Sequence, residues 1–443
     1  MNVDALIAAA RPAASDVHLI ESGIGRHAFV VDGSRFYDLD DTVFQTLKAA
    51  VDQQSVPAAL ASLQLKRARP AIGHDPVVPA PVHALSLAIA QKCNLGCAYC
   101  YAEEGSFGGP AKNMPLETAT ASVEMLLRGK HAGDRVNLAF MGGEPLVNRA
   151  VLREAAKYAR NRAEHLGVVL TFSLTTNGTL LTPADADFLE DYGFAVTISL
   201  DGPAHLHNML RPFKSGRGSF ETIRKAILPL LERQRQMQVS ARVTVTPEHK
   251  NLPQILDDFI RMGFHSVGFS PMLNSPNGRG EMEVGDLKRM LAEMVSCGYA
   301  FEKKTVAGER YPFTNMLQAL KEIHRGTHRP YPCGAGAGYF GVSADGDLAA
   351  CHRFVGNEVG ALGTVSGGVD RERQATWMAD RHVHRQEPCN TCWARYQCGG
   401  GCHHETIGRE RRSCDYIRGW LYYCLGAYAR LAATAPGLFH GHA

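Results

Sequence analysis

Residues 83–100 read HALSLAIAQKCNLGCAYC, an apolar run that leads directly into three closely spaced cysteines. The run is short and almost free of charge, which predicts a buried β-strand. Cys93, Cys97 and Cys100 follow at its carboxyl end. Iron–sulfur clusters are usually held by four cysteines, so three thiolates leave one iron of a [4Fe–4S] cluster open to another ligand. The stretch therefore predicts a cluster whose open iron admits a cofactor.

Zinc is the alternative metal for these three thiolates. A structural zinc site needs four Cys or His ligands, and the sequence has no fourth one close to Cys100. The spacing and the strand before it therefore favour the iron–sulfur cluster.

Downstream of this motif, apolar strands alternate with helical stretches up to about residue 300. Strands are predicted at 83–90, 136–141, 168–175, 194–200, 239–246 and 266–272. Helices are predicted at 116–129, 148–167, 184–193, 219–236 and 251–263. This alternation predicts an α/β fold with a parallel sheet or partial barrel and right-handed crossovers. Ligands bind at the carboxyl ends of such strands, so the residues just past the strand ends should converge on one mouth. These residues are Cys93, Gly142, Asn177, Asp201 and Thr246.

The chain contains twelve cysteines, and they are grouped rather than scattered. None precedes Cys93, and eight fall between Cys333 and Cys424. The N-terminus lacks a charged-then-apolar signal pattern, so we expect a cytoplasmic protein. In a reducing compartment, clustered thiols are metal ligands more often than disulfides. The net charge of +3 gives no reason to expect a nucleic-acid or membrane partner, and no apolar run is long enough for a membrane span.

The chain divides into four predicted parts. Residues 1–66 contain short alternating runs that predict a small meander, followed by a helix that begins near Asp40. Residues 67–82 are rich in proline and read as a linker. Residues 83–326 form the predicted barrel, and residues 327–443 form a Cys- and Gly-rich part with few strands. In this last part we expect a hairpin turning at Asp345-Gly346 and a closing helix.

The CxxxCxxC spacing, with Tyr99 before the last cysteine, resembles the signature of the radical S-adenosylmethionine (SAM) superfamily. The resemblance implies that Cys93, Cys97 and Cys100 hold a [4Fe–4S] cluster that reduces SAM. In that family the cleavage releases methionine and a 5′-deoxyadenosyl radical, which abstracts a hydrogen from the substrate. The protein then supplies orientation and excludes quenching groups.

Three further stretches resemble this family's motifs, in the same order along the chain. Met141-Gly142-Gly143-Glu144-Pro145 resembles its GGEP stretch, Thr176-Asn177-Gly178 its TNG, and Ser199-Leu200-Asp201-Gly202 its SxDG. Glycines allow backbone to approach a ligand, Glu can accept from the SAM ammonium, and Arg suits its carboxylate. By resemblance, SAM is bound by Tyr99, Gly142, Gly143, Glu144, Asn177, Ser199, Asp201 and Arg211.

The C-terminal cysteines resemble the SPASM extension of peptide-modifying radical SAM enzymes, which binds two auxiliary [4Fe–4S] clusters. The resemblance implies a first auxiliary cluster on Cys333, Cys351 and Cys402. It implies a second one on Cys389, Cys392, Cys398 and Cys414, with Cys424 as the alternative last ligand. The chain would then carry three [4Fe–4S] clusters. A zinc ribbon on Cys389, Cys392, Cys398 and Cys402 is the alternative, and it leaves the remaining cysteines without a role.

Two positions depart from the family pattern. The family's four-ligand version has another Cys six residues after Cys333, where this chain has Tyr339. The first auxiliary cluster would therefore have an iron open to a substrate thiol. Sulfatase-maturing relatives have an Asp base directly after the cysteine that corresponds to Cys351, where this chain has His352. This change weakens the formylglycine interpretation.

These features predict a peptide maturase that forms thioether links between a Cys sulfur and a carbon, plausibly the methylene of Asp or Glu. The stretches around the auxiliary cysteines are similar to thioether-forming maturases, including those that act on the small subunit of quinohemoprotein amine dehydrogenase. Expected partners are a Cys-containing peptide or small protein and an electron donor such as flavodoxin or ferredoxin. Asp201 and His352 are the main candidates for the catalytic base, with His205 and His207 also considered.

Two other functions remain open at this point. The first is a sulfatase-type formylglycine-generating or carbon–carbon-forming maturase of the same superfamily. The second is a zinc-stabilised binding protein without redox activity. The N-terminal residues 1–66 would form a winged-helix-like domain whose strand edge binds a leader peptide by β-augmentation, or else a plain structural cap.

Overall fold

The barrel wall is a parallel sheet built from the six predicted strands. The computed structural model describes residues 2–11, 14–66 and 69–440. The sheet runs in the order β10-β9-β8-β7-β6-β4, and every neighbouring pair in this part is parallel. The strands are β4 (Ala84–Gln91), β6 (Arg135–Gly142), β7 (Val169–Thr176), β8 (Ala195–Ser199), β9 (Gln238–Val245) and β10 (Ser266–Pro271). The prediction of a partial α/β barrel is confirmed.

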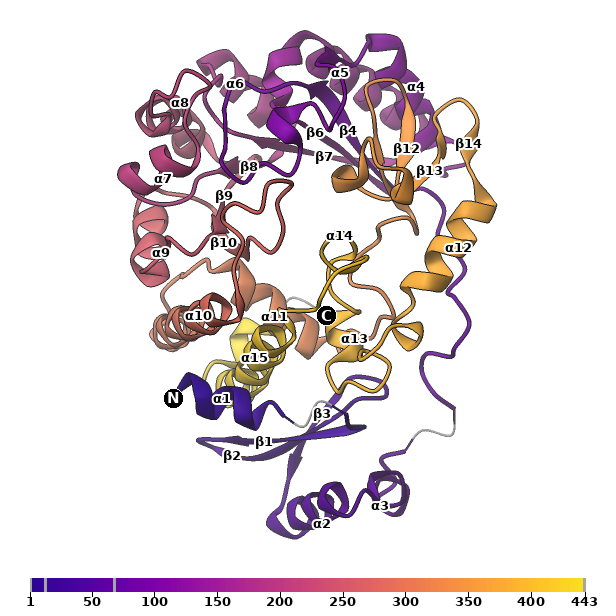
Figure 1. Ribbon diagram of the computed structural model, residues 1–443, viewed down its shortest axis with the longest axis vertical. Helices are drawn as coiled ribbons and strands as arrows, with labels where there is room; N and C mark the ends of the chain where they lie inside the picture. Colours follow the sequence, from indigo (N-terminus) through magenta and orange to yellow (C-terminus); the bar gives the residue numbers. More distant parts are fainter. Residues whose placement is uncertain (1, 12–13, 67–68, 441–443) are drawn as a thin grey trace.

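Helices cover the outer face of this sheet (Figure 1). The helices of this part of the chain are α4 (Leu116–Leu127), α5 (Arg149–Leu166), α6 (Pro183–Asp191), α7 (Ala204–Leu210), α8 (Phe220–Arg233), α9 (Leu252–Arg261), α10 (Val284–Val306) and α11 (Thr314–His324). The predicted helices are all present. Their apolar faces meet the sheet, as where Ile255 and Phe259 of α9 share the core with Val243 of β9. This burial fixes the strand ends on which the site is built.

The C-terminal part extends the barrel sheet beyond β4. The strand β11 (Tyr339–Val342) pairs in parallel with β4, and β12 (Asp347–Ala349) returns antiparallel to it around the predicted Asp345-Gly346 turn. The strands β13 (Ala361–Thr364) and β14 (Gly368–Val369) continue the sheet, so this part holds more strand than the sequence predicts. Four helices follow: α12 (Arg371–Arg381), α13 (Arg395–Cys398), α14 (His403–Thr406) and α15 (Cys414–Thr434).

The N-terminal part is a three-stranded antiparallel sheet with helices on both sides. It consists of α1 (Val3–Ala9), β1 (Val17–Ser22), β2 (Gly25–Val30), β3 (Arg35–Leu39), α2 (Asp41–Asp52) and α3 (Val56–Ser62). One sheet face packs on α2 and α3 through a small separate core that includes Val30 and Leu47. The other face joins the main core, where His18 stacks on Trp393 with ring centroids 4.1 Å apart. Figure 1 shows this sheet beneath α15.

The predicted linker connects this sheet to the barrel. Residues 67–68, at its start, lie outside the described residues, and residues 69–82 form neither helix nor strand. Among the helices that the structure describes, none combines the length and the apolar character needed to cross a bilayer.

Candidate radical SAM site and auxiliary cysteine sets

The first cysteine set lies in the loop that follows β4. Cys93, Cys97 and Cys100 are electrostatically coupled to one another. Burial raises the pKa of the Cys97 thiol to about 12, Arg211 opposes the rise, and the neighbouring thiols add to it. Metal ligands must be thiolates, so these buried groups need positive charge nearby before they can ionise together. A bound cluster and the guanidinium of Arg211 would supply that charge.

Asn177, just past the end of β7, ties this loop to the barrel. Its Nδ2 donates to Asn94 Oδ1 at 2.9 Å and lies 3.6 Å from Cys93 Sγ. Its Oδ1 accepts from the backbone nitrogen of Thr179 at 2.9 Å and from the Oγ1 of the same residue at 2.6 Å. The Asn of the Thr-Asn-Gly stretch therefore fixes the position of the loop that carries the first cysteine.

Gly142 and Gly143 allow a close approach between two segments of the protein itself. A Cβ on Gly142, whose φ is +137°, would lie 2.4 Å from the carbonyl oxygen of Ala90. A Cβ on Gly143 would lie 2.4 Å from the carbonyl oxygen of Lys92. The turn after β6 thus sits against the chain that enters the cysteine loop, and larger residues would push the two apart. The approach of these glycines to SAM stays a prediction.

Glu144 is fully buried and braces the same region. Its Oε1 accepts from the backbone nitrogen of Leu146 at 3.0 Å and from Thr176 Oγ1 at 2.7 Å, and its Oε2 accepts from the backbone nitrogen of Asn177 at 2.7 Å. Burial raises the pKa of this carboxyl, and the three donors oppose the rise. One acceptor position on Oε2 is left for the ammonium of a ligand.

Tyr99, Asp201 and Arg211 form one buried network beside the cysteine loop. The Tyr99 hydroxyl donates to Asp201 Oδ2, and Arg211 Nη1 donates to the Tyr99 oxygen at 2.8 Å. Arg211 is 9% exposed, and its Nε is buried without a partner in the described part of the chain. Ser199 ends β8 two residues before Asp201. A buried Arg with a free donor fits the carboxylate of an amino-acid ligand.

The expected convergence of the strand ends is borne out by a series of hydrogen bonds. The loop after β4 meets Asn177 after β7, as described above. Asp201, after β8, accepts at Oδ1 from the backbone nitrogen of Thr244 at 3.0 Å. His249 Nε2 bonds to the Asp201 carbonyl at 2.7 Å, and its Nδ1 accepts from the backbone nitrogen of Thr246 at 3.0 Å. Side chains from successive strand ends therefore form one connected mouth.

The second cysteine set joins residues far apart in the sequence. Cys333, Cys351 and Cys402 are electrostatically coupled to one another. Burial raises the pKa of Tyr339 and negative charge on Cys351 or Cys333 adds to the rise, so this tyrosine lies close to both thiols. The Tyr339 hydroxyl lies 2.9 Å from His352 Nδ1. Burial raises the pKa of the Cys351 thiol to about 12. Tyr339 stands where the family's four-ligand version has a cysteine, and His352 stands where the sulfatase-maturing relatives have an Asp. The structure joins these two residues by a hydrogen bond.

Three consecutive glycines form a turn between Cys398 and Cys402, and Cys402 lies with the second cysteine set. Gly399, Gly400 and Gly401 all have positive φ angles, of 67°, 90° and 79°. A Cβ on Gly399 would lie 2.3 Å from the backbone nitrogen of Pro332, the residue before Cys333. The turn therefore packs directly against the segment that carries the first member of the set.

The third cysteine set lines one pocket. The four cysteines of this set are Cys389, Cys392, Cys398 and Cys414, and small residues also line the pocket. Three guanidinium groups complete its walls, those of Arg395, Arg411 and Arg418. Burial raises the pKa of Cys398 to about 12, and the other three thiols add to the rise. A four-iron cluster with four thiolate ligands carries negative charge, so the cationic walls fit such a group.

Cys424 and Cys297 stand apart from all three sets. Both are fully buried, and Cys424 Sγ lies 3.9 Å from Met316 Sδ in the helical core. Burial raises the pKa of both thiols. Of the two alternatives for the last ligand of the second auxiliary cluster, the structure groups Cys414 with Cys389, Cys392 and Cys398. Across the described residues, no three His, Cys, Asp or Glu side chains gather tightly enough to hold a single metal ion.

The candidate bases are differently engaged. Asp201 is fully buried, and both of its carboxylate oxygens accept hydrogen bonds, as given above. Burial lowers the pKa of His352 to about 4, with Arg353 adding to the effect, so the imidazole is neutral at pH 7. His352 packs edge-on against Tyr101, with ring centroids 6.0 Å apart, which places it between the first and second cysteine sets. His207 is buried, and its two ring nitrogens form hydrogen bonds with the Asp201 backbone and with Ser219 Oγ. Burial lowers its pKa to about 4.

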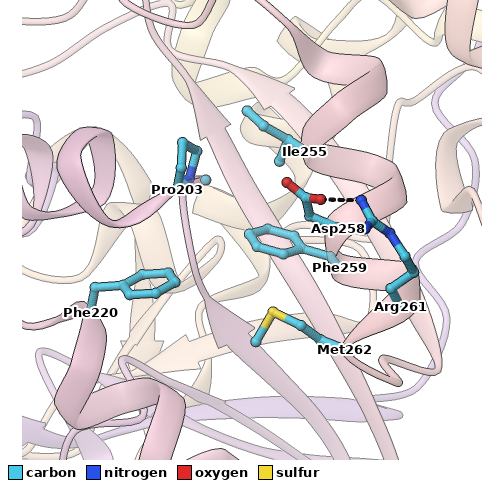
Figure 2. Close-up of a pocket in the computed structure, with 8 residues that line it drawn as sticks. Pro203, Phe220, Ile255, Asp258, Phe259, Arg261 and Met262 are labelled. Carbon is cyan, nitrogen blue, oxygen red and sulfur yellow. Dashed lines mark hydrogen bonds and ion pairs between the residues drawn. The ribbon is translucent and has the colours of Figure 1, made fainter.

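A separate pocket lies between α8 and α9, beside the loop that leads into α7. Figure 2 shows its lining, with Phe220 on one side and Ile255 and Phe259 on the other. Its charged groups, Asp258 and Arg261, are paired with each other. None of the predicted site residues lines this pocket, so it is not part of the mouth.

Comparisons with known proteins agree with this geometry. Residues 87–258 match the model of the Radical SAM superfamily. The chain is 27% identical over 381 residues to a serine-type anaerobic sulfatase-maturating enzyme of Klebsiella aerogenes, covering 84% of this chain and 88% of that protein.

Two solved structures are similar in fold. The structure of anSMEcpe with bound AdoMet aligns with a TM-score of 0.67 and 21% identity, over 81% of this chain and all of that one. Streptococcus suis SuiB bound to precursor peptide SuiA aligns with a TM-score of 0.53 and 14% identity, over 90% of this chain and 97% of that one. The matched segment contains β6 to β9 and the first cysteine set. Over residues 87–258 the chain therefore resembles the radical SAM superfamily, whose cofactors are a [4Fe–4S] cluster and SAM.

Proposed function

We propose that this protein is a radical SAM peptide maturase that joins a Cys sulfur to a carbon atom within a peptide or small protein. The observation that carries the proposal is the set of Cys333, Cys351 and Cys402, with Tyr339 in the place of a fourth thiol. Soft thiolates are the ligands that iron–sulfur clusters prefer, so a three-thiol site leaves one position for a thiol from the substrate. We assign the remaining sets as the cysteines of the SAM cluster and of a second auxiliary cluster.

The residues of the chain divide the work of this reaction. When bound, SAM and the three clusters supply the carbon radical, an iron for the substrate thiol and sites for the released electron. Arg211 holds the SAM carboxylate, and the free acceptor position of Glu144 takes the ammonium. Asn177 keeps the first cysteine loop in place. His352, which follows Cys351 and is hydrogen-bonded to Tyr339, accepts the proton of the substrate thiol.

We extend the proposal to the partners of the reaction. The edge strand β3 of the N-terminal sheet binds a leader segment of the substrate by β-augmentation, as an added strand with backbone hydrogen bonds. A flavodoxin or ferredoxin in the cytoplasm supplies electrons. The leader assignment predicts that a substrate truncated before its modified segment binds the full-length enzyme more weakly than the intact substrate.

Formylglycine formation is the second candidate, because the curated relative at 27% identity is named as a sulfatase-maturating enzyme. The two products are separated by their chemistry. A thioether removes an alkylatable thiol and adds no carbonyl, whereas formylglycine is an aldehyde that reacts with a hydrazide.

The test uses anaerobically purified full-length enzyme, SAM, a reductant and candidate Cys-containing peptides. We expect a peptide that loses two hydrogens and one iodoacetamide-reactive thiol per link, with no hydrazide adduct. A hydrazide-reactive product would overturn the thioether proposal in favour of formylglycine. Production of 5′-deoxyadenosine with every supplied peptide unchanged would exclude those peptides as the substrate.

A further inference from the structure

We propose that Tyr99 and Asp201 are positioning residues, which hold the guanidinium of Arg211 ready for the SAM carboxylate. The sequence motifs suggest that both residues touch the cofactor directly. The structure instead directs their polar groups toward each other and toward Arg211. The inference rests on SAM as the cofactor and is independent of the peptide product.

The side chain of Arg211 is fixed through Tyr99. Arg211 Nη1 donates to the phenol oxygen at 2.8 Å, and the phenol proton is directed to Asp201 Oδ2. Asp201 is held in turn, because its Oδ1 accepts from the backbone nitrogen of Thr244. Tyr99 is 5% exposed and Asp201 is fully buried. The hydroxyl of Tyr99 therefore links the Asp201 carboxylate to the Arg211 guanidinium.

The backbone of Arg211 is fixed by a second route from the same aspartate. The Asp201 backbone nitrogen donates to His207 Nδ1 at 3.2 Å, so the ring proton is on Nε2. That proton points to Ser219 Oγ at 3.0 Å, and the Ser219 hydroxyl donates to the Arg211 carbonyl at 2.5 Å. The donors and acceptors run in one consistent direction around a closed ring of five residues. Both ends of Arg211 are thus held before any ligand arrives.

What remains free on Arg211 is the edge that binds carboxylates. Nη1 is used by Tyr99, whereas Nε is buried without a partner in the part of the chain that the structure describes. Nε and Nη2 form one side of the planar guanidinium, and this side matches the two oxygens of a carboxylate. Burial raises the pKa of the Cys97 thiol and the charge of Arg211 opposes the rise, so the guanidinium lies close to the first cysteine set. An arginine that is already held in this way loses little conformational entropy when the ligand binds.

The test compares two ligands on the reconstituted holoenzyme, SAM and 5′-methylthioadenosine, which lacks the amino-acid moiety. The variant Tyr99→Phe keeps the ring and removes only the hydroxyl. We expect its SAM dissociation constant to rise about tenfold, the loss expected for one hydrogen bond to a charged group. Its affinity for methylthioadenosine should stay within about twofold of the wild-type value, because that ligand offers Arg211 no carboxylate.

The matched control is Tyr311→Phe, which removes a tyrosine hydroxyl that donates to Asp257 at 2.7 Å outside the mouth. It should leave both affinities unchanged. Ser219→Ala breaks the ring on its other side and keeps the idea testable if Tyr99→Phe fails to retain its iron. We expect about a threefold weaker SAM affinity from it, again with methylthioadenosine unaffected. An unchanged SAM affinity, or equal losses for both ligands, would overturn the proposal.

Discussion

The mouth of the barrel and the C-terminal cysteine region treat buried polar groups in opposite ways. At the mouth, Glu144 accepts a hydrogen bond from Asn177, Asn177 donates to Asn94, and Asp201 accepts from Thr244. Arg211 Nε has no partner in the described ranges of the chain. In the C-terminal region, buried side-chain atoms lack a partner among the described residues in Arg353, Arg381, His403, His404, Glu405 and Arg418. His403, directly after Cys402, has both ring nitrogens unpaired.

The difference indicates what each region needs from its cofactors. A buried polar atom without a partner costs about 1–3 kcal/mol, so several of them together weaken a fold considerably. At the barrel mouth, the carboxylates of Glu144 and Asp201 are paired within the protein. We infer that clusters, when bound, compensate for the unpaired donors of the C-terminal region. Metal binding and folding are then coupled in this region more strongly than in the barrel.

The largest expected effect comes from the third cysteine set. Cys414→Ser should lose about four of the twelve irons per chain that three four-iron clusters imply. Cys424→Ala should keep the full iron content, because Cys424 packs in the helical core rather than in the cysteine pocket. Iron and sulfide analysis of anaerobically purified protein measures both. Loss of iron from Cys424→Ala alone would reverse the assignment.

Removal of the clusters with a chelator should act unevenly along the chain. We expect faster amide exchange across residues 327–440, because their buried polar groups lose their compensating partners. Strands β6 to β9 should keep their protection, since their hydrogen bonds and core do not depend on metal. Hydrogen-exchange mass spectrometry follows both regions in one experiment. Equal loosening of both regions would contradict the contrast drawn between them.

Within the mouth, Glu144→Gln should destabilise the protein by about 2 kcal/mol. The amide replaces a carboxylate that accepts three hydrogen bonds, and its NH2 group faces a donor instead. The matched control is Glu124→Gln, a carboxylate that is 41% exposed and binds Arg162 on the surface. Its cost should stay below about 1 kcal/mol, as for other surface pairs. Urea unfolding of both variants provides the comparison.

The smallest expected effect is a shift in reduction potential. Arg418 lines the pocket of the third set, and it is electrostatically coupled to Cys392 and Cys414. Removing its positive charge in Arg418→Gln should lower the midpoint potential of that cluster, because reduction adds negative charge. Redox titration followed by electron paramagnetic resonance measures the shift. An unchanged potential would mean that solvent screens this arginine from the cluster.

Local patterns were sufficient for the barrel and for the first cysteine set. Apolar runs such as 83–90 have the length and composition of buried strands, and Cys93, Cys97 and Cys100 lie within one loop. The hairpin at Asp345-Gly346 was also predictable from its turn residues. The short strands β13 and β14 were missed, because two to four residues carry too little pattern to separate a strand from a loop.

The sequence by itself determined the order of strands and helices, the three-thiol loop and the presence of further cysteine sets, because these depend on spacing along the chain. Only the tertiary structure decided how the later cysteines are divided, since the turn at Gly399 packs against Pro332 and brings Cys402 to Cys333. It also brings the side chains of Tyr99 and Asp201 together. Their shared hydrogen bond joins residues about a hundred positions apart, and no local pattern records such a contact.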